Sequence, residues 1–160
     1  MPKIYDLSSV VSTIQKLKKQ GKKIVLTTGV FDHLHQAHQE FLTKGKQVGD
    51  ILVVGIETDD RVKKLKGPNR PVHKLQTRLE NLAKQSSTDM VFALPKDFDK
   101  PAHHQDLISA IRPDIFAVSS HSPNIDKKRA LVEKYGGQLV VVMQHDPQIS
   151  TTKIIQNIQG

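Results

Sequence analysis

Five apolar runs, separated by stretches with helical spacing, constrain the fold of this 160-residue chain most strongly. The runs are KIVLTTG (23–29), DILVVGIE (50–57), DMVFAL (89–94), DIFAVS (114–119) and QLVVVM (138–143). Strands that are apolar without alternation are buried on both faces, which is typical of a parallel sheet covered by helices on either side. With right-handed crossovers, the pattern predicts a doubly wound five-stranded parallel sheet of the α/β class, in a single domain over residues 1–160.

Apolar residues at helical spacing fill the intervals between these runs. We expect the first helix to begin at Asp6 or Ser8 and to end at Gly21, and the second to cover 35–48. Further helices are expected near 74–86, near 103–111, near 125–135 and from Ser150 onward. The basic segment 61–70 reads as a loop.

The composition excludes several classes of protein. The chain has no cysteine, so disulfides and thiolate metal sites are excluded. No apolar run reaches the length of about 18 residues that a membrane helix needs. The N-terminus also lacks the basic-then-apolar pattern of a signal peptide. We therefore expect a cytoplasmic protein that does not contact a membrane.

The formal net charge of +8 indicates an anionic partner, either nucleic acid or phosphorylated small molecules. Part of the excess lies in KLKKQGKK (16–23), where cations suit a helix end, and part lies in RVKKLKGPNR (61–70). Aromatic residues make up only 4% of the chain, so platforms for stacking bases are scarce. Nucleic-acid binding through segment 61–70 therefore rests on charge alone.

The stretch GVFDHLHQAHQEFL (29–42) follows the first apolar run and contains His33, His35 and His38. In a doubly wound sheet, ligands bind beyond the carboxyl ends of the strands, where this stretch lies. Gly29 allows a tight turn, and the helix that follows offers free N–H groups and a positive dipole end to a phosphate. His35 and His38 are three residues apart, so on a helix they would face that phosphate together.

Two other readings of these histidines stay open. They could be surface or satisfied core residues, which is the usual role of a single histidine. They could also be metal ligands, but His35 and His38 lack a third ligand because Glu40 points elsewhere on the helix. We therefore predict no metal held by protein side chains alone.

Four segments, in order, resemble the cytidylyltransferase-like nucleotidyltransferases. TTGVFDHLHQAHQEFL is similar to their glycine-x-phenylalanine-aspartate turn followed by His-x-Gly-His, and ISTTKII (149–155) is similar to their last helix start. TDDRVKKLKGPNRPV (58–72) resembles the basic loop of the heptose-phosphate adenylyltransferase branch, and KLQTRLENLAKQSSTDMVF (74–92) resembles its helix with a functional arginine. The likeness runs from about residue 5 to 158, with glycerol-3-phosphate cytidylyltransferase about equally near.

The resemblance implies transfer of a nucleoside monophosphate from CTP or ATP to a phosphorylated polyol or sugar, such as glycerol 3-phosphate or a heptose phosphate. Magnesium would accompany the nucleoside triphosphate, and a homodimer is suggested. The acceptor phosphate would attack the α-phosphate in line, so catalysis would be mainly positioning and charge stabilisation.

The resemblance also implies roles for single residues. The implied catalytic residues are His35, His38, Lys64 and Arg78. The implied nucleotide-binding residues are Thr28, Gly29, Val30, Phe31, Ser150, Thr151 and Thr152. The implied phosphate- or acceptor-binding residues are Lys66, Arg70, His121 and His145. Asp32 would brace the turn, and His33 would be structural or peripheral.

For the positively charged residues, purely structural roles stay possible beside these functional ones. Segment 61–70 could be a solvated charge run. Arg78, which we expect on the polar face of its helix, could form a surface ion pair.

Three departures from the family pattern weaken the likeness. Ala37 stands where the motif has glycine, and VSSHS (118–122) stands where related enzymes have glycine-aspartate, sometimes preceded by lysine. His145 stands where the cytidylyltransferase branch has arginine. The alternative is therefore a catalytically impaired protein of the same fold that binds or senses a nucleotide.

Overall fold

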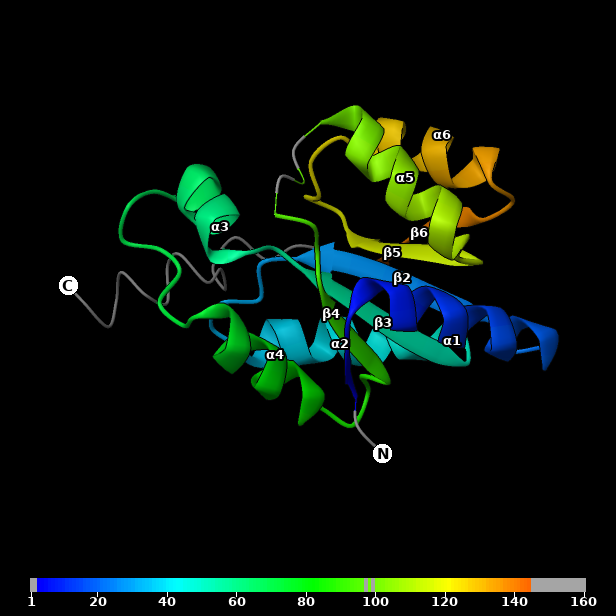
Figure 1. The fold of residues 1–160 in the computed structure, drawn as a ribbon, viewed down its shortest axis with the longest axis horizontal. Helices are drawn as coiled ribbons and strands as arrows, with labels where there is room; N and C mark the ends of the chain where they lie inside the picture. The colour runs from blue at the N-terminus through cyan, green and yellow to red at the C-terminus, as the bar shows by residue number, and fades with distance from the viewer. Residues whose placement is uncertain (1–2, 97, 99, 145–160) are drawn as a thin grey trace.

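The computed structural model describes residues 3–96, 98 and 100–144, whose six strands all run parallel in one sheet (Figure 1). The strands are β1 (Ile4–Tyr5), β2 (Ile24–Gly29), β3 (Ile51–Ile56), β4 (Met90–Ala93), β5 (Ile115–Ser119) and β6 (Gln138–Met143). The helices are α1 (Leu7–Lys19), α2 (Gln36–Gln47), α3 (Asp59–Lys66), α4 (Leu75–Ala83), α5 (Pro101–Ile111) and α6 (Ile125–Lys134). The predicted α/β class is confirmed.

The sheet has one strand more than the five that the sequence predicted. Strand β1 has only two residues, and it pairs with β4 through Ile4 opposite Val91 and Tyr5 opposite Phe92. A two-residue strand is too short to show either an apolar run or an alternation, so its sequence carries no strand signal.

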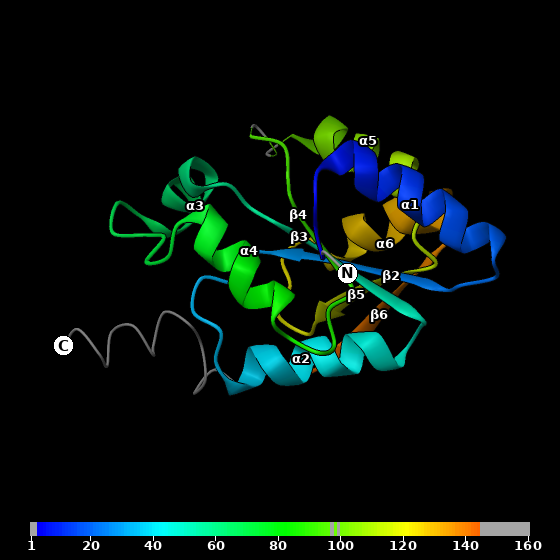
Figure 2. The same cartoon turned by 60° about the horizontal axis from the view of Figure 1, so that its bottom comes forward.

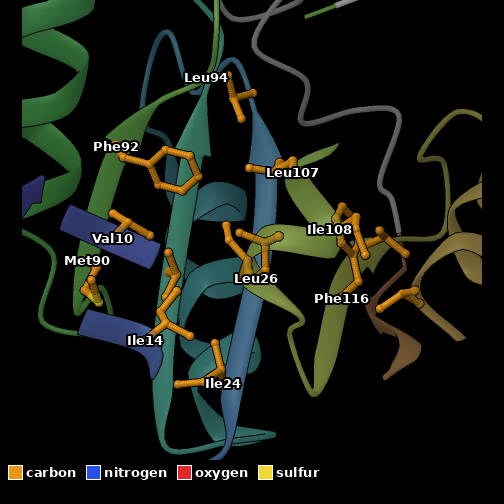
Figure 3. Packing of buried hydrophobic residues seen from close by; sticks show 14 of the residues in the cluster. Val10, Ile14, Ile24, Leu26, Met90, Phe92, Leu94, Leu107, Ile108 and Phe116 are labelled. Atoms are coloured by element: carbon orange, nitrogen blue, oxygen red, sulfur yellow. The ribbon is translucent and has the colours of Figure 1, made fainter. Parts of the chain in front are cut away.

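The helices cover both faces of the sheet. Helices α1, α5 and α6 lie on one face, and α2 and α4 lie on the other (Figures 1 and 2). The first layer packs Val10 and Ile14 of α1 with Leu107 and Ile108 of α5 over Leu26 and Phe92 of the sheet (Figure 3). The second layer packs Leu42, Leu79 and Leu82 against the opposite face. Burying each such side chain contributes roughly 1.5–3 kcal/mol, which fixes the sheet as a platform.

Local signals set the helix ends. The carboxylate of Asp6 accepts a hydrogen bond from the Ser9 N–H at 2.8 Å, so the predicted N-cap of α1 is Asp6 rather than Ser8. Gly21, at φ +81°, follows the end of the same helix. The helix expected from Ser150 lies outside the described residues.

Segment 61–70 is largely helical and corrects the expectation of a loop. Helix α3 has Asp59 and Asp60 in its first turn and three lysines in its last turn, which complements the helix dipole at both ends. Gly67, at φ +106°, terminates it. Only Val62 of this helix is buried, so the segment lacks the apolar stripe that identifies a helix in a sequence.

The strand order β1-β4-β3-β2-β5-β6 places the topological switch at β2. The chain leaves β2 toward β3 on one side, and returns to pair β5 with β2 on the other. The carboxyl ends beside β2 are therefore the expected binding edge. Helix α3 lies beyond this edge (Figure 1). In the part of the chain that the structure describes, no helix is long and apolar enough to cross a membrane.

Candidate functional site

The turn after β2 is built by Gly29 and Phe31. Phe31 has a left-handed backbone, at φ +48°, and its side chain folds back to 7% exposure. A Cβ atom on Gly29 would lie 2.9 Å from Cε2 of Phe31, so only glycine fits there without displacing the ring. A non-glycine residue at positive φ is strained, and such strain concentrates at functional sites. The turn carries Thr28, Gly29 and Val30 past the edge of the sheet.

Asp32 braces this turn from beneath, as predicted. Its carboxylate is 1% exposed and accepts hydrogen bonds from Nε of Arg70 at 2.8 Å, from the Val72 N–H at 2.7 Å and from the His73 N–H at 2.8 Å. Burial alone raises the pKa of Asp32, but the hydrogen bonds from His73, Val72 and Arg70 outweigh it and hold the pKa below its usual value. Arg70 is thus part of the brace, and its contact with phosphate stays a prediction.

Arg78 is a second brace, and the expectation that it lies on the polar face of its helix was wrong. Its side chain is fully buried, and Nε donates to the carbonyl of His73 at 2.9 Å. Nη1 donates to the carbonyls of Val30 at 3.1 Å and Glu57 at 2.7 Å, and Nη2 to Asp59 Oδ1 at 2.7 Å. One guanidinium therefore joins the turn after β2, the end of β3, α3 and the segment before α4. Its predicted catalytic role stays a prediction.

His35 and His38 lie together at the start of α2, as the motif spacing predicted. Their rings stack with centroids 4.0 Å apart. His35 is the N-cap residue, and its Nδ1 accepts the Ala37 N–H at 3.2 Å. With Nδ1 as acceptor, a neutral His35 carries its proton on Nε2. That Nε2 atom is buried and has no hydrogen-bond partner among the described residues.

Both imidazoles favour the neutral form. Burial lowers the pKa of His38 to about 4, assisted by nearby His35, and burial also lowers the pKa of His35. His38 Nδ1 donates to the carbonyl of His33 at 3.1 Å, which opposes part of this shift. At neutral pH the pair therefore offers hydrogen bonds rather than positive charge.

Other residues named in the sequence analysis lie at several places around the pair. The His33 ring stacks on His73 with centroids 6.2 Å apart, and its charge contributes to the lowered pKa of both His35 and His38, so its structural or peripheral role stays a prediction. Lys64 and Lys66 are exposed on α3, and the charge of Lys66 contributes to the lowered pKa of His38. His121 is exposed in the turn after β5.

Four predicted residues lie beyond the part of the chain that the structure describes, and a further expectation concerns metal ligands. His145, Ser150, Thr151 and Thr152 lie outside the described residues. Among the residues that are described, no group of three histidine, aspartate or glutamate side chains could hold a metal ion.

The sequence reasoning missed Glu57 and Lys128 at this edge, and it gave Arg61 no role beyond the basic segment 61–70. Glu57 directly follows β3, Arg61 lies on α3 and Lys128 lies on α6. Burial raises the pKa of Glu57 to about 7, while Arg61, Arg78 and Lys128 oppose the rise. The available signal was the position of Glu57 immediately after an apolar run, which places it at the carboxyl edge.

A family model described as cytidylyltransferase-like matches residues 26–157. Among curated proteins, the bifunctional protein HldE of Desulfatibacillum aliphaticivorans is 32% identical over 99% of this chain, and that of Methylobacillus flagellatus is 39% identical over 98%. The chain spans 31% of the length of each of these relatives.

Solved structures show the same fold. A lipopolysaccharide core biosynthesis protein from Thermoplasma volcanium is 22% identical, with a TM-score of 0.66 over 79% of this chain and all of that one. Pantoate-beta-alanine ligase from Francisella tularensis is 17% identical, with a TM-score of 0.60 over 98% of this chain and 76% of that one. Because the family model matches most of the sequence, the chain belongs to the cytidylyltransferase-like family of nucleotidyltransferases.

Proposed function

We propose that the protein transfers an adenylyl group from ATP to a phosphorylated sugar of the heptose phosphate kind and releases pyrophosphate. The observation that carries the proposal is the stacked pair of His35 and His38 at a helix N-terminus, with a buried Nε2–H on His35 that has no partner among the described residues. A buried donor without a partner costs free energy, and a phosphate oxygen would supply the acceptor.

In the proposed reaction, an oxygen of the acceptor phosphate attacks the α-phosphorus of ATP. The bond from that phosphorus to the bridging oxygen breaks, and pyrophosphate leaves with the electron pair. His35 would donate from Nε2 to an oxygen on the α-phosphate or the leaving group, and His38 would assist from the same face. Donors fixed where charge develops stabilise the transition state without reorganisation.

The surrounding residues would hold the triphosphate. Backbone groups of Thr28, Gly29, Val30 and Phe31 would lie along the nucleotide, because the turn after β2 stands at the carboxyl edge of the sheet. Lys64 and Lys66 of α3 would clamp phosphates as exposed cations, and Ser150, Thr151 and Thr152 stay predicted phosphate ligands. His121 and His145 stay predicted acceptor ligands.

Magnesium would bind together with the triphosphate rather than at a site made by protein side chains alone. The oxygens of Asp32 already accept hydrogen bonds from Arg70, Val72 and His73, and the described residues contain no three-ligand cluster. Magnesium ordinarily binds through substrate phosphates and retains waters, which fits this donor set. When bound, it would neutralise charge on the phosphates.

The preference for ATP and a heptose phosphate over CTP and glycerol 3-phosphate rests on two supports. Segment 58–72 resembles the heptose-phosphate adenylyltransferase branch, and both curated relatives reported above are named HldE. A homodimer, which the resemblance suggests, and a cytoplasmic location, which the composition suggests, stay predictions.

The test measures pyrophosphate release with magnesium, each of ATP, CTP, GTP and UTP, and a panel of sugar and polyol phosphates. We expect release with ATP and a heptose phosphate. The second candidate, a binding protein without turnover, is favoured by Ala37 in place of the motif glycine. Nucleotide binding without pyrophosphate from any pairing would support that candidate and overturn the proposal.

A further inference from the structure

Glu57 lies directly beside the turn after β2. Its backbone N–H donates to the carbonyl of Gly29 at 3.0 Å, and its own carbonyl accepts from Arg78 at 2.7 Å. Its side chain is half-buried, yet it forms no hydrogen bond or salt bridge with any residue that the structure describes, and its Oε2 atom is shielded from solvent. The backbone of Glu57 is thus held by two hydrogen bonds, whereas its carboxylate forms none with the described residues.

Two neighbours of Glu57 in the sequence share this property. Thr58 Oγ1 and Arg61 Nε are also buried, and neither has a hydrogen-bond partner within the described part of the chain. Three unpartnered polar atoms therefore lie within five residues, 57–61, at the carboxyl edge of the sheet. Buried polar groups in native proteins are ordinarily paired, so such a cluster calls for an explanation.

Lys128 reaches the same edge from α6. Its Nζ donates to Ser122 Oγ at 2.8 Å, within the segment after β5. Together with Thr28 of β2, it lines a small cavity of about 10 Å³. Burial lowers the pKa of Lys128, and the charge of Glu57 opposes that shift.

We propose that Glu57, Arg61 and Lys128 form an acceptor subsite that binds the hydroxyl groups of a polyhydroxylated phosphate ester beside the Gly29 turn. The inference rests on the proposed function, because it identifies the second substrate of that reaction. The carboxylate accepts hydrogen bonds from hydroxyls, and the two cations balance its charge and donate in return. The residues come from the position after β3, from α3 and from α6, and they stand at an edge where VSSHS (118–122) supplies no acid.

This subsite would discriminate by hydroxyl content. A site with buried polar groups rejects a ligand that leaves those groups unpaired, whereas phosphate alone satisfies only the cations. An acceptor with several hydroxyls should therefore bind better than one with few, at equal phosphate charge.

The test compares binding of three probes by calorimetry: a heptose 1-phosphate, glycerol 3-phosphate and inorganic phosphate, each with and without a non-hydrolysable ATP analogue and magnesium. For the native protein, we expect affinity to fall in that order. Glu57→Gln should weaken the heptose phosphate by roughly 10- to 100-fold, the loss expected for a hydrogen bond to a charged group. Affinity for inorganic phosphate and for the ATP analogue should stay within about twofold.

The matched control is Glu133→Gln on the exposed face of α6, which should change none of these affinities. Glu57→Gln should fold, because glutamine has nearly the same shape and the Glu57 side chain forms no hydrogen bond with the described residues that the change would remove. Equal binding of heptose phosphate by the native protein and Glu57→Gln overturns the subsite, as does the absence of any preference over inorganic phosphate. This experiment measures binding and not turnover. A failure to release pyrophosphate would therefore overturn the proposed function, while the binding comparison would still test the subsite.

Discussion

The rings of His35 and His38 stack with centroids 4.0 Å apart, and the backbone N–H of Ala37 between them is capped by His35 Nδ1. The cap fixes which nitrogen of His35 carries the proton, and so directs an N–H donor from Nε2. The pair is thus oriented by the helix start itself.

Replacing either histidine with alanine should remove a donor to the developing charge. For His35→Ala and for His38→Ala we expect kcat to fall by roughly 10²- to 10³-fold, the usual cost of one such donor. The KM for ATP should change much less. Steady-state pyrophosphate release measures both parameters.

His33→Ala is the control for these two variants. The His33 ring stacks on His73, and its backbone carbonyl, which alanine retains, accepts a hydrogen bond from His38 Nδ1. Activity should stay within about threefold of the native value. A loss equal to that of His38→Ala would contradict the assignment of roles.

The low pKa of His38 makes stability depend on pH. The folded protein holds this pKa at about 4, below the unfolded value of 6.5, so the unfolded chain binds more protons between these values. The contribution is fully present above pH 6.5 and is lost as the pH falls through 4. Urea titrations from pH 7.5 to pH 4 should show a smaller acid loss for His38→Gln than for the native protein.

Arg78 should contribute strongly to the free energy of unfolding. Arg78→Met leaves the carbonyls of His73, Val30 and Glu57 and the carboxylate of Asp59 without their donor, so we expect a loss of about 3–5 kcal/mol. Arg78→Lys should recover only part of it, because one ammonium group cannot reach all four acceptors. Urea denaturation measures both.

The matched control is Arg129→Met, which removes an exposed pair with Asp126 and should cost less than about 1 kcal/mol. Similar losses at positions 78 and 129 would show that the buried network contributes little.

Ala37→Gly tests whether the alanine methyl group impairs the site. Position 37 lies in the first turn of α2, where glycine should lower stability by roughly 0.5–1 kcal/mol. Because the Ala37 N–H is already occupied by His35, we expect the affinity for ATP to stay within about threefold. A gain of tenfold or more in ATP affinity would show instead that the methyl group displaces the nucleotide.

The sequence predicts the five longer strands because each is an apolar run, of which β2, β3, β4 and β5 are mostly buried and β6, at the edge of the sheet, is only partly buried. It does not predict β1, which has two residues, or α3, whose buried surface is a single valine. These elements depend on neighbours that are distant in the chain.

The candidate site divides in the same way. The histidine pair follows from spacing along one helix start. The burial of Arg78 does not, because its acceptors come from separate segments between residues 30 and 73. The cluster around Glu57 also forms only when α3 and α6 meet the end of β3. Local periodicity carries no information about such contacts.

The most direct measurement of the central claim is the mass of the product formed from ATP, magnesium and a heptose 1-phosphate. Transfer of an adenylyl group predicts pyrophosphate and an ADP-linked heptose, whose mass is that of the acceptor plus AMP less one water. Unchanged substrates, or ADP with a second phosphate on the heptose, would contradict the account.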